Sequence, residues 1–331
     1  MTQLGFWKNL PKPFFCLAPM ADVTDCAFRS LIAKYSRPNV FFTEFVSADG
    51  LAHPEAREKL LIDLKYGKNE HPIVAQIFGG NPENIRDATK LCKKLGFDGI
   101  DLNMGCPDRS VEKQCAGAAM MKDHKLAKSI IRAAKESGLP VSIKTRIGYN
   151  KDEIETWIPA LLEEDLAALS IHLRTRKEMS DVPAHWEVVK RIVEIRDQIS
   201  KSTLIIGNGD IVDIDDARKK YKETGCDGVM LGRAIFGNPW LFADLAYGER
   251  SSQIEHPDRS VGTREKLKVM IEHTKLFEKL LSKYKNFAIM KKHFKAYVEG
   301  FEGAKKLRME LMETKSASEA EECIEQFLKS R

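Results

Sequence analysis

The sequence lacks the cysteine pairs that mark a zinc site or a disulfide framework. Its seven cysteines are scattered and odd in number, and none forms a CxxC pair, so no bound metal is predicted. No apolar run approaches the length of a membrane span, and the first residues, MTQLGFWKNLPKP, lack the apolar stretch of a signal peptide. We therefore expect a cytoplasmic protein with no membrane partner.

Strong net charge is also missing over most of the chain. The formal net charge is +5, and 43% hydrophobic with 31% charged residues is typical of a globular protein with a sizeable core. The positive charge is concentrated between Thr263 and Glu310, which holds thirteen Lys and Arg but six Asp and Glu. Such a segment indicates a polyanionic partner, and a solvated helical face is the simpler alternative.

Apolar runs alternate with amphipathic segments over the first 245 residues. The segments 82–96, 126–138 and 213–225 each end in glycine, as helices often do. Apolar strands that alternate with such helices predict parallel β/α units, and eight units match a (β/α)8 TIM barrel. A doubly wound open sheet is the competing fold, but no GxGxxG follows the first run. The eight predicted strands are 14–20, 40–45, 72–78, 99–104, 141–147, 167–173, 203–209 and 228–233.

The last part of the chain follows a different pattern. Residues 246–262 are polar and lack apolar periodicity, so we interpret them as a linker. Beyond them, apolar residues recur at helical spacing from Leu267 to Leu281. The predicted organisation is a barrel at 1–245, the linker at 246–262 and a small C-terminal helical domain at 263–331.

Polar side chains close nearly every predicted strand. The active face of a TIM barrel lies at the carboxyl ends of its strands, so a ring of polar ends predicts a site. Glycine-rich loops follow the last two strands, where barrels commonly bind phosphate, although tight turns explain these loops equally well. The residues at the strand ends are Met20, Glu44, Gln76, Asn103, Lys144, His172, Asn208 and Arg233.

The stretch 101-DLNMGCPDRS-110 places Cys106 between a glycine and a proline, directly after an apolar run. Pro107 has no amide N–H, and Gly105 permits backbone angles closed to other residues. This combination predicts a shaped loop that presents a thiol. An inert, buried cysteine is the ordinary alternative for a lone cysteine.

Taken together, seven motifs resemble the tRNA-dihydrouridine synthase family. They occur in the family's order over roughly residues 14–300, and the combination of NMGCP, KTR, HxRTR and GNPW is highly specific. The tail segment 291-KKHFKAYVEGF-301 resembles the family's helical domain. The motifs are 17-LAPMADVTDCAFR-29, 74-VAQIFG-79, 102-LNMGCPDRSVEKQCAGAAMM-121, 143-IKTRIG-148, 171-IHLRTR-176, 207-GNGDI-211 and 231-LGRAIFGNPW-240.

The resemblance implies an FMN-containing barrel that reduces a uridine of tRNA to 5,6-dihydrouridine, with NADPH recharging the flavin. Hydride transfer to C6 of uracil requires a proton at C5, and Cys106 matches the catalytic thiol. A thiol with an ordinary pKa of about 8.5 is mostly protonated at neutral pH and can serve as a general acid. The base must leave its stack to reach the flavin. The expected partner is tRNA, and a monomer is expected.

The resemblance also implies which residues hold the cofactor. One segment after the first strand lies beside the flavin, three polar residues contact its ring, and the two glycine-rich loops cradle its phosphate. In that order these residues are Ala18, Pro19 and Met20, then Gln76, Lys144 and His172, then Asn208, Gly209, Asp210, Gly232 and Arg233.

The implied substrate contacts come from the barrel and the tail. Asn103 and Arg146 match groups that reach the target base. Arg174 and Arg176 either contact RNA or pair with acidic neighbours. In the basic tail, phosphate contact is expected from Lys291, Lys292 and Lys295.

Two residues depart from the family pattern, and two rival functions remain. Cys115 stands where the family commonly has glycine, and Leu173 stands where a small residue is usual.

One rival function is an FMN barrel that reduces a free pyrimidine, which would not need the basic tail. The other is an RNA-binding barrel without catalysis, which would not need the intact set of Cys106, Lys144 and His172.

Overall fold

The computed structural model describes residues 4–246 and 261–330. Within them, nine parallel strands form one sheet in the order β1-β9-β8-β7-β6-β5-β4-β2, and β3 also pairs with β4. The Leu17 amide donates to the Val40 carbonyl at 3.2 Å, which brings β1 beside the segment before β2 and closes the barrel. The predicted TIM barrel is confirmed. The strands are β1 (Phe14–Leu17), β2 (Phe41–Phe42), β3 (Val46–Ser47), β4 (Ile73–Phe78), β5 (Gly99–Met104), β6 (Val141–Arg146), β7 (Ala168–His172), β8 (Leu204–Asn208) and β9 (Gly228–Leu231).

Within the second predicted strand, 40–45, only Phe41–Phe42 form a strand (β2). β3 follows directly after it at Val46–Ser47, and both strands pair with β4. The interruption lies at Thr43. Its hydroxyl oxygen accepts the Gln76 amide at 3.0 Å, so a side chain replaces a main-chain carbonyl in the ladder. One side chain thus ends the regular pairing that the apolar pattern predicted.

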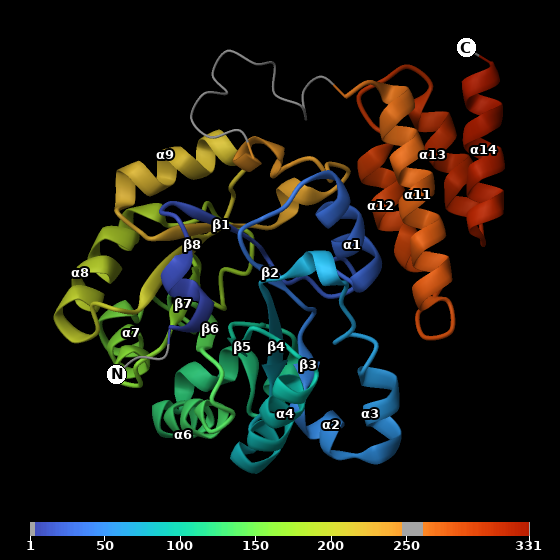
Figure 1. The fold of residues 1–331 in the computed structure, drawn as a ribbon. Helices are drawn as coiled ribbons and strands as arrows, with labels where there is room; N and C mark the ends of the chain where they lie inside the picture. Colours follow the sequence, from blue (N-terminus) through green and yellow to red (C-terminus); the bar gives the residue numbers. More distant parts are fainter. Residues whose placement is uncertain (1–3, 247–260, 331) are drawn as a thin grey trace. The chain divides into compact units, whose positions relative to one another are not determined.

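Helices surround the strands of the barrel (Figure 1). The three helices predicted from glycine-terminated segments are α4, α6 and α9, with slightly different ends. Each begins at a side-chain cap, and α9 ends at Gly225 with φ of +72°. The helices between the strands are α2 (Ala48–Ala52), α3 (Pro54–Leu60), α4 (Pro82–Lys94), α5 (Arg109–Glu112), α6 (His124–Lys135), α7 (Ile154–Leu162), α8 (Val189–Ile199) and α9 (Ile214–Thr224).

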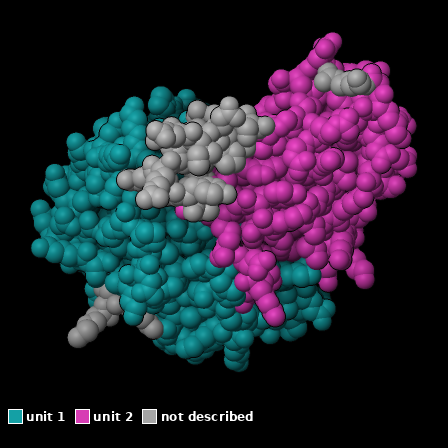
Figure 2. Space-filling view, turned by 45° about the horizontal axis from the view of Figure 1, so that its top comes forward, with its two compact units in different colours: residues 1–20, 38–65, 71–232 teal, residues 21–37, 66–70, 233–331 magenta. Residues whose placement is uncertain are grey.

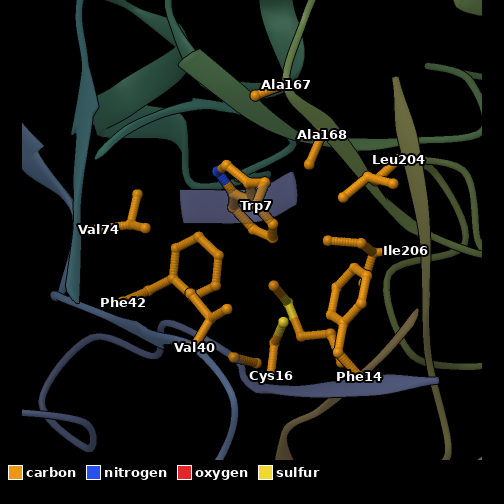
Figure 3. Close-up of a cluster of buried hydrophobic side chains, with 12 residues drawn as sticks. Trp7, Phe14, Cys16, Val40, Phe42, Val74, Ala167, Ala168, Leu204 and Ile206 are labelled. Atoms are coloured by element: carbon orange, nitrogen blue, oxygen red, sulfur yellow. The ribbon is translucent and has the colours of Figure 1, made fainter. Parts of the chain in front are cut away.

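An apolar layer fills the barrel near the amino ends of its strands. Trp7, from the short helix η1 (Gly5–Asn9), lies among the side chains of Phe14, Phe42 and Ile206 (Figure 3). Its ring is 5.9 Å from that of Phe14 and 6.4 Å from that of Phe42 between centroids. Truncating such a residue costs about 3–5 kcal/mol of stability. This layer seals one end, so polar side chains can occupy the other.

The chain divides into two compact units, coloured separately in Figure 2. The first contains residues 1–20, 38–65 and 71–232, and the second contains 21–37, 66–70 and 233–331. The second unit therefore groups the helix after β1 with the tail. The predicted boundaries at 245 and 263 stay a prediction, and residues 247–260 of the predicted linker lie outside the described residues. The main helices of the second unit are α1 (Cys26–Tyr35), α11 (Thr263–Leu281), α12 (Met290–Tyr297), α13 (Ala304–Glu313) and α14 (Ala317–Lys329).

Candidate active site

The strand register places the predicted polar residues side by side. Asn103 on β5 lies opposite Lys144 on β6. His172 at the end of β7 pairs with Arg146 on β6 and with Asn208 on β8. Because the strands are parallel, these residues share the carboxyl end of the barrel. The fold thus brings together Asn103, Lys144, His172 and Asn208, four of the eight predicted strand-end residues.

The loop that carries Cys106 is held by the side chain of Asn103. The Asn103 Oδ1 atom accepts hydrogen bonds from the amides of Gly105 at 3.2 Å and Cys106 at 2.9 Å. On the other side of the loop, the Cys106 carbonyl accepts the Ala118 amide at 2.9 Å. The backbone of Cys106 is therefore fixed at both its donor and its acceptor, as the predicted shaped loop requires.

The glycines of this loop serve different purposes. Gly105 does not use the left-handed region, so the expectation of special backbone angles there is wrong. Glycine is favoured at position 105 because the loop passes close to β6, where a Cβ would lie 3.1 Å from the backbone of Thr145. Gly117 supplies the unusual angle, with φ of +59°, and a Cβ there would lie 2.7 Å from the Cys106 carbonyl oxygen.

Cys115, the departure from the family pattern, is exposed and has φ of +53°. Glycine adopts this left-handed conformation freely, whereas other residues pay roughly 1–2 kcal/mol. The structure therefore gives a physical reason for glycine at this position. Leu173, the other departure, is fully buried.

The Cys106 thiol is half-buried against apolar side chains. It packs on the cluster of Phe78, Val111 and Ala116. This burial raises the pKa of the thiol, and the nearby positive charge of Lys144 acts in the opposite direction. The thiol is consequently protonated at neutral pH, which suits a proton donor rather than a nucleophile.

Arg146 binds backbone carbonyls from two loops. It donates to the carbonyl oxygens of Gly105 at 2.9 Å and of Thr175 and Met179 at 3.0 Å each. Burial lowers its pKa to about 10, so the group stays charged at neutral pH. Arg146 thus ties the loop of Cys106 to the loop after β7, and its contact with the target base stays a prediction.

Arg176 forms a bidentate ion pair with Glu112, with N···O distances of 2.7 and 3.0 Å. The same guanidinium reaches the Pro107 carbonyl oxygen at 3.5 Å. The Tyr149 ring lies 5.4 Å from the Arg176 guanidinium carbon and 3.7 Å from Lys122 Nζ. Of the two roles expected for Arg176, the structure shows the pairing with an acidic neighbour, and RNA contact stays a prediction.

Arg174 is buried and forms an ion pair with Asp210. It also donates to the His172 Nε2 atom at 3.2 Å. A guanidinium can only donate, so Nε2 is the acceptor and the ring proton lies on Nδ1. Arg174 therefore fixes the tautomer of His172, and acidic pairing is again the observed alternative.

Lys144 is half-buried and makes no hydrogen bond or ion pair with the residues that the structure describes. Its pKa is lowered to about 8, first by burial and then by the charge of Arg146. The residue opposite it on β7, Ser170, has a buried hydroxyl that also lacks a partner among the described residues. Two neighbouring polar groups are thus available to a ligand.

The glycine-rich loops leave space beside the segment after β1. A Cβ at Gly232 would lie 3.6 Å from the Ala18 Cβ and 3.7 Å from the Met20 Sδ. Gly209 has φ of +140°, and a Cβ there would collide with Ala184 at 2.7 Å. Glycine is therefore required at Gly209, whereas at Gly232 it keeps the surface beside Ala18 and Met20 free of a side chain.

The remaining predicted cofactor residues are less informative. Pro19 lies between Ala18 and Met20, and Asn208 donates to the Met230 carbonyl at 2.9 Å. Arg233 begins the short helix η5 (Arg233–Ile235) of the second unit. Their contacts with a cofactor stay predictions.

Sequence reasoning missed Asp101 and Ser142, which lie on the inner face of the barrel below Asn103 and Lys144. The Asp101 carboxylate accepts the Ser142 hydroxyl at 2.6 Å and the Gln76 side-chain amide at 2.7 Å. Burial raises the pKa of Asp101 to about 6. Both residues were missed because the prediction used only the strand ends. The signal that could have found them is the alternation of polar residues along β5 and β6.

The three lysines predicted to bind phosphate are on α12 of the second unit. Lys292 and Lys295 are exposed and Lys291 is half-buried, while Phe294 of the same helix is fully buried. None of the three lysines forms an ion pair within the part of the chain that the structure describes. Their positive charge is thus available, and tRNA contact stays a prediction.

Among residues 4–246 and 261–330, no group of three or more His, Cys, Asp or Glu side chains is placed to hold a metal ion. In the same ranges, no helix combines the length and the hydropathy that crossing a bilayer requires.

The fold and the site define a TIM-barrel protein with a protonated thiol and an available lysine at the carboxyl ends of its strands. The family model described as dihydrouridine synthase matches residues 16–331. The chain is 43% identical over 325 residues to a probable tRNA-dihydrouridine synthase of Staphylococcus aureus, covering 98% of this chain and 95% of the relative. It is 40% identical over 329 residues to probable tRNA-dihydrouridine synthase 2 of Bacillus subtilis, covering 99% and 97%. The chain belongs to the dihydrouridine synthase family, which confirms the resemblance of its motifs.

A solved structure with the same fold is that of 6-hydroxypseudooxynicotine amine oxidase from Pseudomonas geniculata. Its TM-score is 0.53 at 12% identity, and the match covers 71% of this chain and 47% of that chain. This chain therefore spans about half the length of that protein. At such low identity the likeness concerns the fold alone.

Proposed function

We propose that this chain is an oxidoreductase that reduces a uridine of tRNA to 5,6-dihydrouridine, with a bound FMN that NADPH recharges. The relatives named tRNA-dihydrouridine synthases, which match nearly the full chain, support the substrate and the reaction. The observation that carries the proposal is the Cys106 thiol, which is held protonated in a fixed loop at the carboxyl end of the barrel. A reduction that adds hydrogen across a carbon–carbon double bond needs such a proton donor.

The residues at this end of the barrel fit an anionic heterocycle. Lys144 offers a cation and Ser170 a hydroxyl without partners among the described residues, and Gly232 keeps space open beside Ala18 and Met20. When bound, FMN would take hydride from NADPH and supply it to C6 of the uracil. The residues assigned to hold it are Ala18, Pro19, Met20, Gln76, Lys144, His172, Asn208, Gly209, Asp210, Gly232 and Arg233.

In this proposal Cys106 donates its proton to C5 of the uracil and becomes a thiolate, which water then reprotonates. The apolar cluster around the thiol keeps the proton in place until the substrate needs it. Lys144 and Arg146, whose charges lower the pKa of the thiol, stabilise the thiolate that remains. Burial and positive charge therefore act at different stages of one proton transfer.

Asn103 and Arg146 are proposed to face the target base. The Asn103 side chain is already bonded to Gln76 and to the Cys106 loop, so base contact would use its remaining N–H. Arg146 uses Nε and Nη1 for carbonyls, and its Nη2 makes no hydrogen bond to the described residues. Nη2 is therefore the group of Arg146 that we assign to the substrate.

The basic helices at 263–331 are proposed to bind the tRNA backbone. The available charges of Lys291, Lys292 and Lys295 support this role, because phosphate contacts supply most of the non-specific affinity for nucleic acid. A tRNA substrate implies a cytoplasmic protein, and we propose that it acts as a monomer.

Mapping dihydrouridine in cellular tRNA tests the proposed function. Cells that lack this gene should lose dihydrouridine at one or more positions, and the wild-type gene should restore it. The Cys106→Ala gene should not restore it at equal expression. An unchanged tRNA modification pattern in the gene-deleted cells would refute the function and favour a free pyrimidine as substrate or an RNA-binding role.

A further inference from the structure

Four hydrogen bonds connect the interior of the barrel to the Cys106 loop. The Ser142 hydroxyl donates to Asp101 Oδ1 at 2.6 Å, and Gln76 Nε2 donates to Asp101 Oδ2 at 2.7 Å. Asn103 Nδ2 donates to Gln76 Oε1 at 3.1 Å, and the Cys106 amide donates to Asn103 Oδ1 at 2.9 Å. We call the series Asp101–Gln76–Asn103–Cys106 the interior relay.

The relay can run in only one direction. The Cys106 amide can only donate, so Asn103 must present its oxygen to the loop and its nitrogen to Gln76. Gln76 must then present its oxygen to Asn103, which turns its own nitrogen toward Asp101. An ionised carboxylate only accepts, so Asp101 satisfies that nitrogen. Turning over either amide would place two donors against each other at one of its ends and two acceptors against each other at the other end.

The strands fix the spacing of the relay. Gln76 is paired with Asp101 across β4 and β5, and Asp101 is paired with Ser142 across β5 and β6. Gln76 and Asp101 have no exposed surface, and Asn103 is 9% exposed. Gln76 therefore depends on protein partners for its hydrogen bonds, and an unsatisfied buried group is costly.

We propose that Asp101 is a positioning residue for Cys106, acting through the two amides of the relay. Without an acceptor at position 101, the buried Gln76 amide nitrogen loses its partner, so Gln76, and through it Asn103, is no longer held in the single orientation that fixes the loop. Asp101 touches neither the thiol nor the substrate in this role. The functional consequence rests on the proposed function, because it assumes that Cys106 is the proton donor.

A second role for Asp101 must be separated from this one, because its negative charge also acts on Lys144. That charge raises the pKa of Lys144, against the larger effect of burial. Asp101→Asn separates the two roles. Its oxygen can still accept from Gln76, and its nitrogen can donate to Ser142, whose hydroxyl already lies 3.3 Å from the Ile100 carbonyl as an alternative acceptor. The charge is lost while the relay is kept.

The test measures amide hydrogen exchange and thiol alkylation in the purified full-length protein, without tRNA. Asp101→Ala should speed exchange in a peptide covering 104–109 by about tenfold or more, and should change the rate of Cys106 alkylation by iodoacetamide severalfold. Asp101→Asn should stay within about threefold of wild type in both. These readouts need no turnover, so they separate failure of the relay from failure of the proposed function.

Asp227→Ala is the matched control, because Asp227 is a buried acid that bonds Arg196 and the Ile205 amide elsewhere in the barrel. It should lower global stability without speeding exchange at 104–109. If Asp101→Ala does not fold, Gln76→Met must loosen the same peptide. A wild-type exchange rate in the folded variant would overturn the proposal, and so would an Asp101→Asn protein that behaves like Asp101→Ala.

Discussion

The guanidinium of Arg176 donates two hydrogen bonds, of 2.7 and 3.0 Å, to the carboxylate of Glu112. Glu112 closes the short helix that follows Cys106, and Arg176 lies in the loop after β7. The pair thus joins two loops at the carboxyl end of the barrel. Its partial exposure limits its contribution to stability to about 1 kcal/mol or less.

This pair separates the two roles that the sequence leaves open for Arg176. If the residue serves only the loop, Arg176→Ala and Glu112→Gln should weaken tRNA binding equally and slightly. If Arg176 also contacts tRNA, Arg176→Ala should weaken binding more, because Glu112→Gln leaves the guanidinium free for phosphate. Affinities within about threefold of each other would support the loop role alone, and a larger loss for Arg176→Ala would support the predicted RNA contact. Filter binding of tRNA by both variants and by the double variant decides it.

The pKa of Lys144 predicts how FMN binding depends on pH. Burial lowers that pKa to about 8, so the flavin-free protein carries the positive charge below pH 8 and loses it above. FMN affinity should therefore be highest near pH 7 and fall by up to about tenfold per pH unit above pH 8. Fluorescence titration of FMN into flavin-free protein measures this.

Lys144→Met should bind FMN weakly at pH 7 and show a flatter pH profile. Lys90→Met, at an exposed position on α4, is the matched control and should follow the wild type. An unchanged profile in Lys144→Met would remove the lysine from the cofactor site.

Two buried histidines predict the acid sensitivity of the second unit. His273 stacks on Phe28 with 4.6 Å between ring centroids and lies 4.5 Å from His293, and neither imidazole has a hydrogen-bond partner among the described residues. Burial lowers the pKa of both, that of His293 to about 3. Both are therefore neutral in the folded protein.

The folded state disfavours the protonated imidazoles, whereas the unfolded chain binds protons near pH 6.5. Stability from these two groups is therefore complete above about pH 6.5. It falls as the pH decreases from there toward the folded pKa values, by up to about 1.4 kcal/mol per pH unit for each histidine. Thermal denaturation between pH 7.5 and 5 should show a falling midpoint. His273→Phe should flatten the decrease, and the exposed control His53→Gln should not.

The lysines of α12 predict a salt-dependent contact with tRNA. Each phosphate contact that is lost should flatten the slope of log affinity against log salt by roughly 0.7–0.9. The triple variant Lys291→Ala, Lys292→Ala and Lys295→Ala should therefore weaken binding and flatten the slope, with FMN content near normal. A control variant with Lys219, Lys220 and Lys222 of α9 replaced by alanine changes the net charge equally. If both variants change the slope alike, the α12 lysines have no specific contact.

The barrel could be predicted because its evidence is local. Apart from 40–45, each apolar run contains one strand buried on both sides, and each glycine-terminated segment is an amphipathic helix. The alternation alone therefore indicates parallel β/α units. The polar strand ends could be predicted as a group for the same reason, because parallel strands bring their carboxyl ends together. Cys106 stood out through its neighbours in the chain.

The relations between loops could not be predicted. The motifs predict Arg146 and Arg176 near the substrate. Only the folded chain shows that Gly105, Met179 and Glu112 accept hydrogen bonds from their guanidinium groups. Asp101 was overlooked because its role depends on partners from three strands. Thr43 ends a strand through one hydroxyl, which hydrophobic periodicity does not register.

The proposed reaction is the reduction of uridine in tRNA, with Cys106 supplying the proton. In a single-turnover experiment under anaerobic conditions, FMN-loaded protein that NADPH has reduced is mixed with unmodified tRNA. The dihydrouridine formed and the flavin reoxidised are both measured. We expect about one dihydrouridine per flavin with tRNA and far less with free uridine. Cys106→Ala should be reduced by NADPH normally but form dihydrouridine roughly 10²–10⁴-fold more slowly, whereas Cys115→Ala should resemble wild type. Equal rates for Cys106→Ala and wild type would refute the role of Cys106, and equal reduction of free uridine would refute tRNA as the substrate.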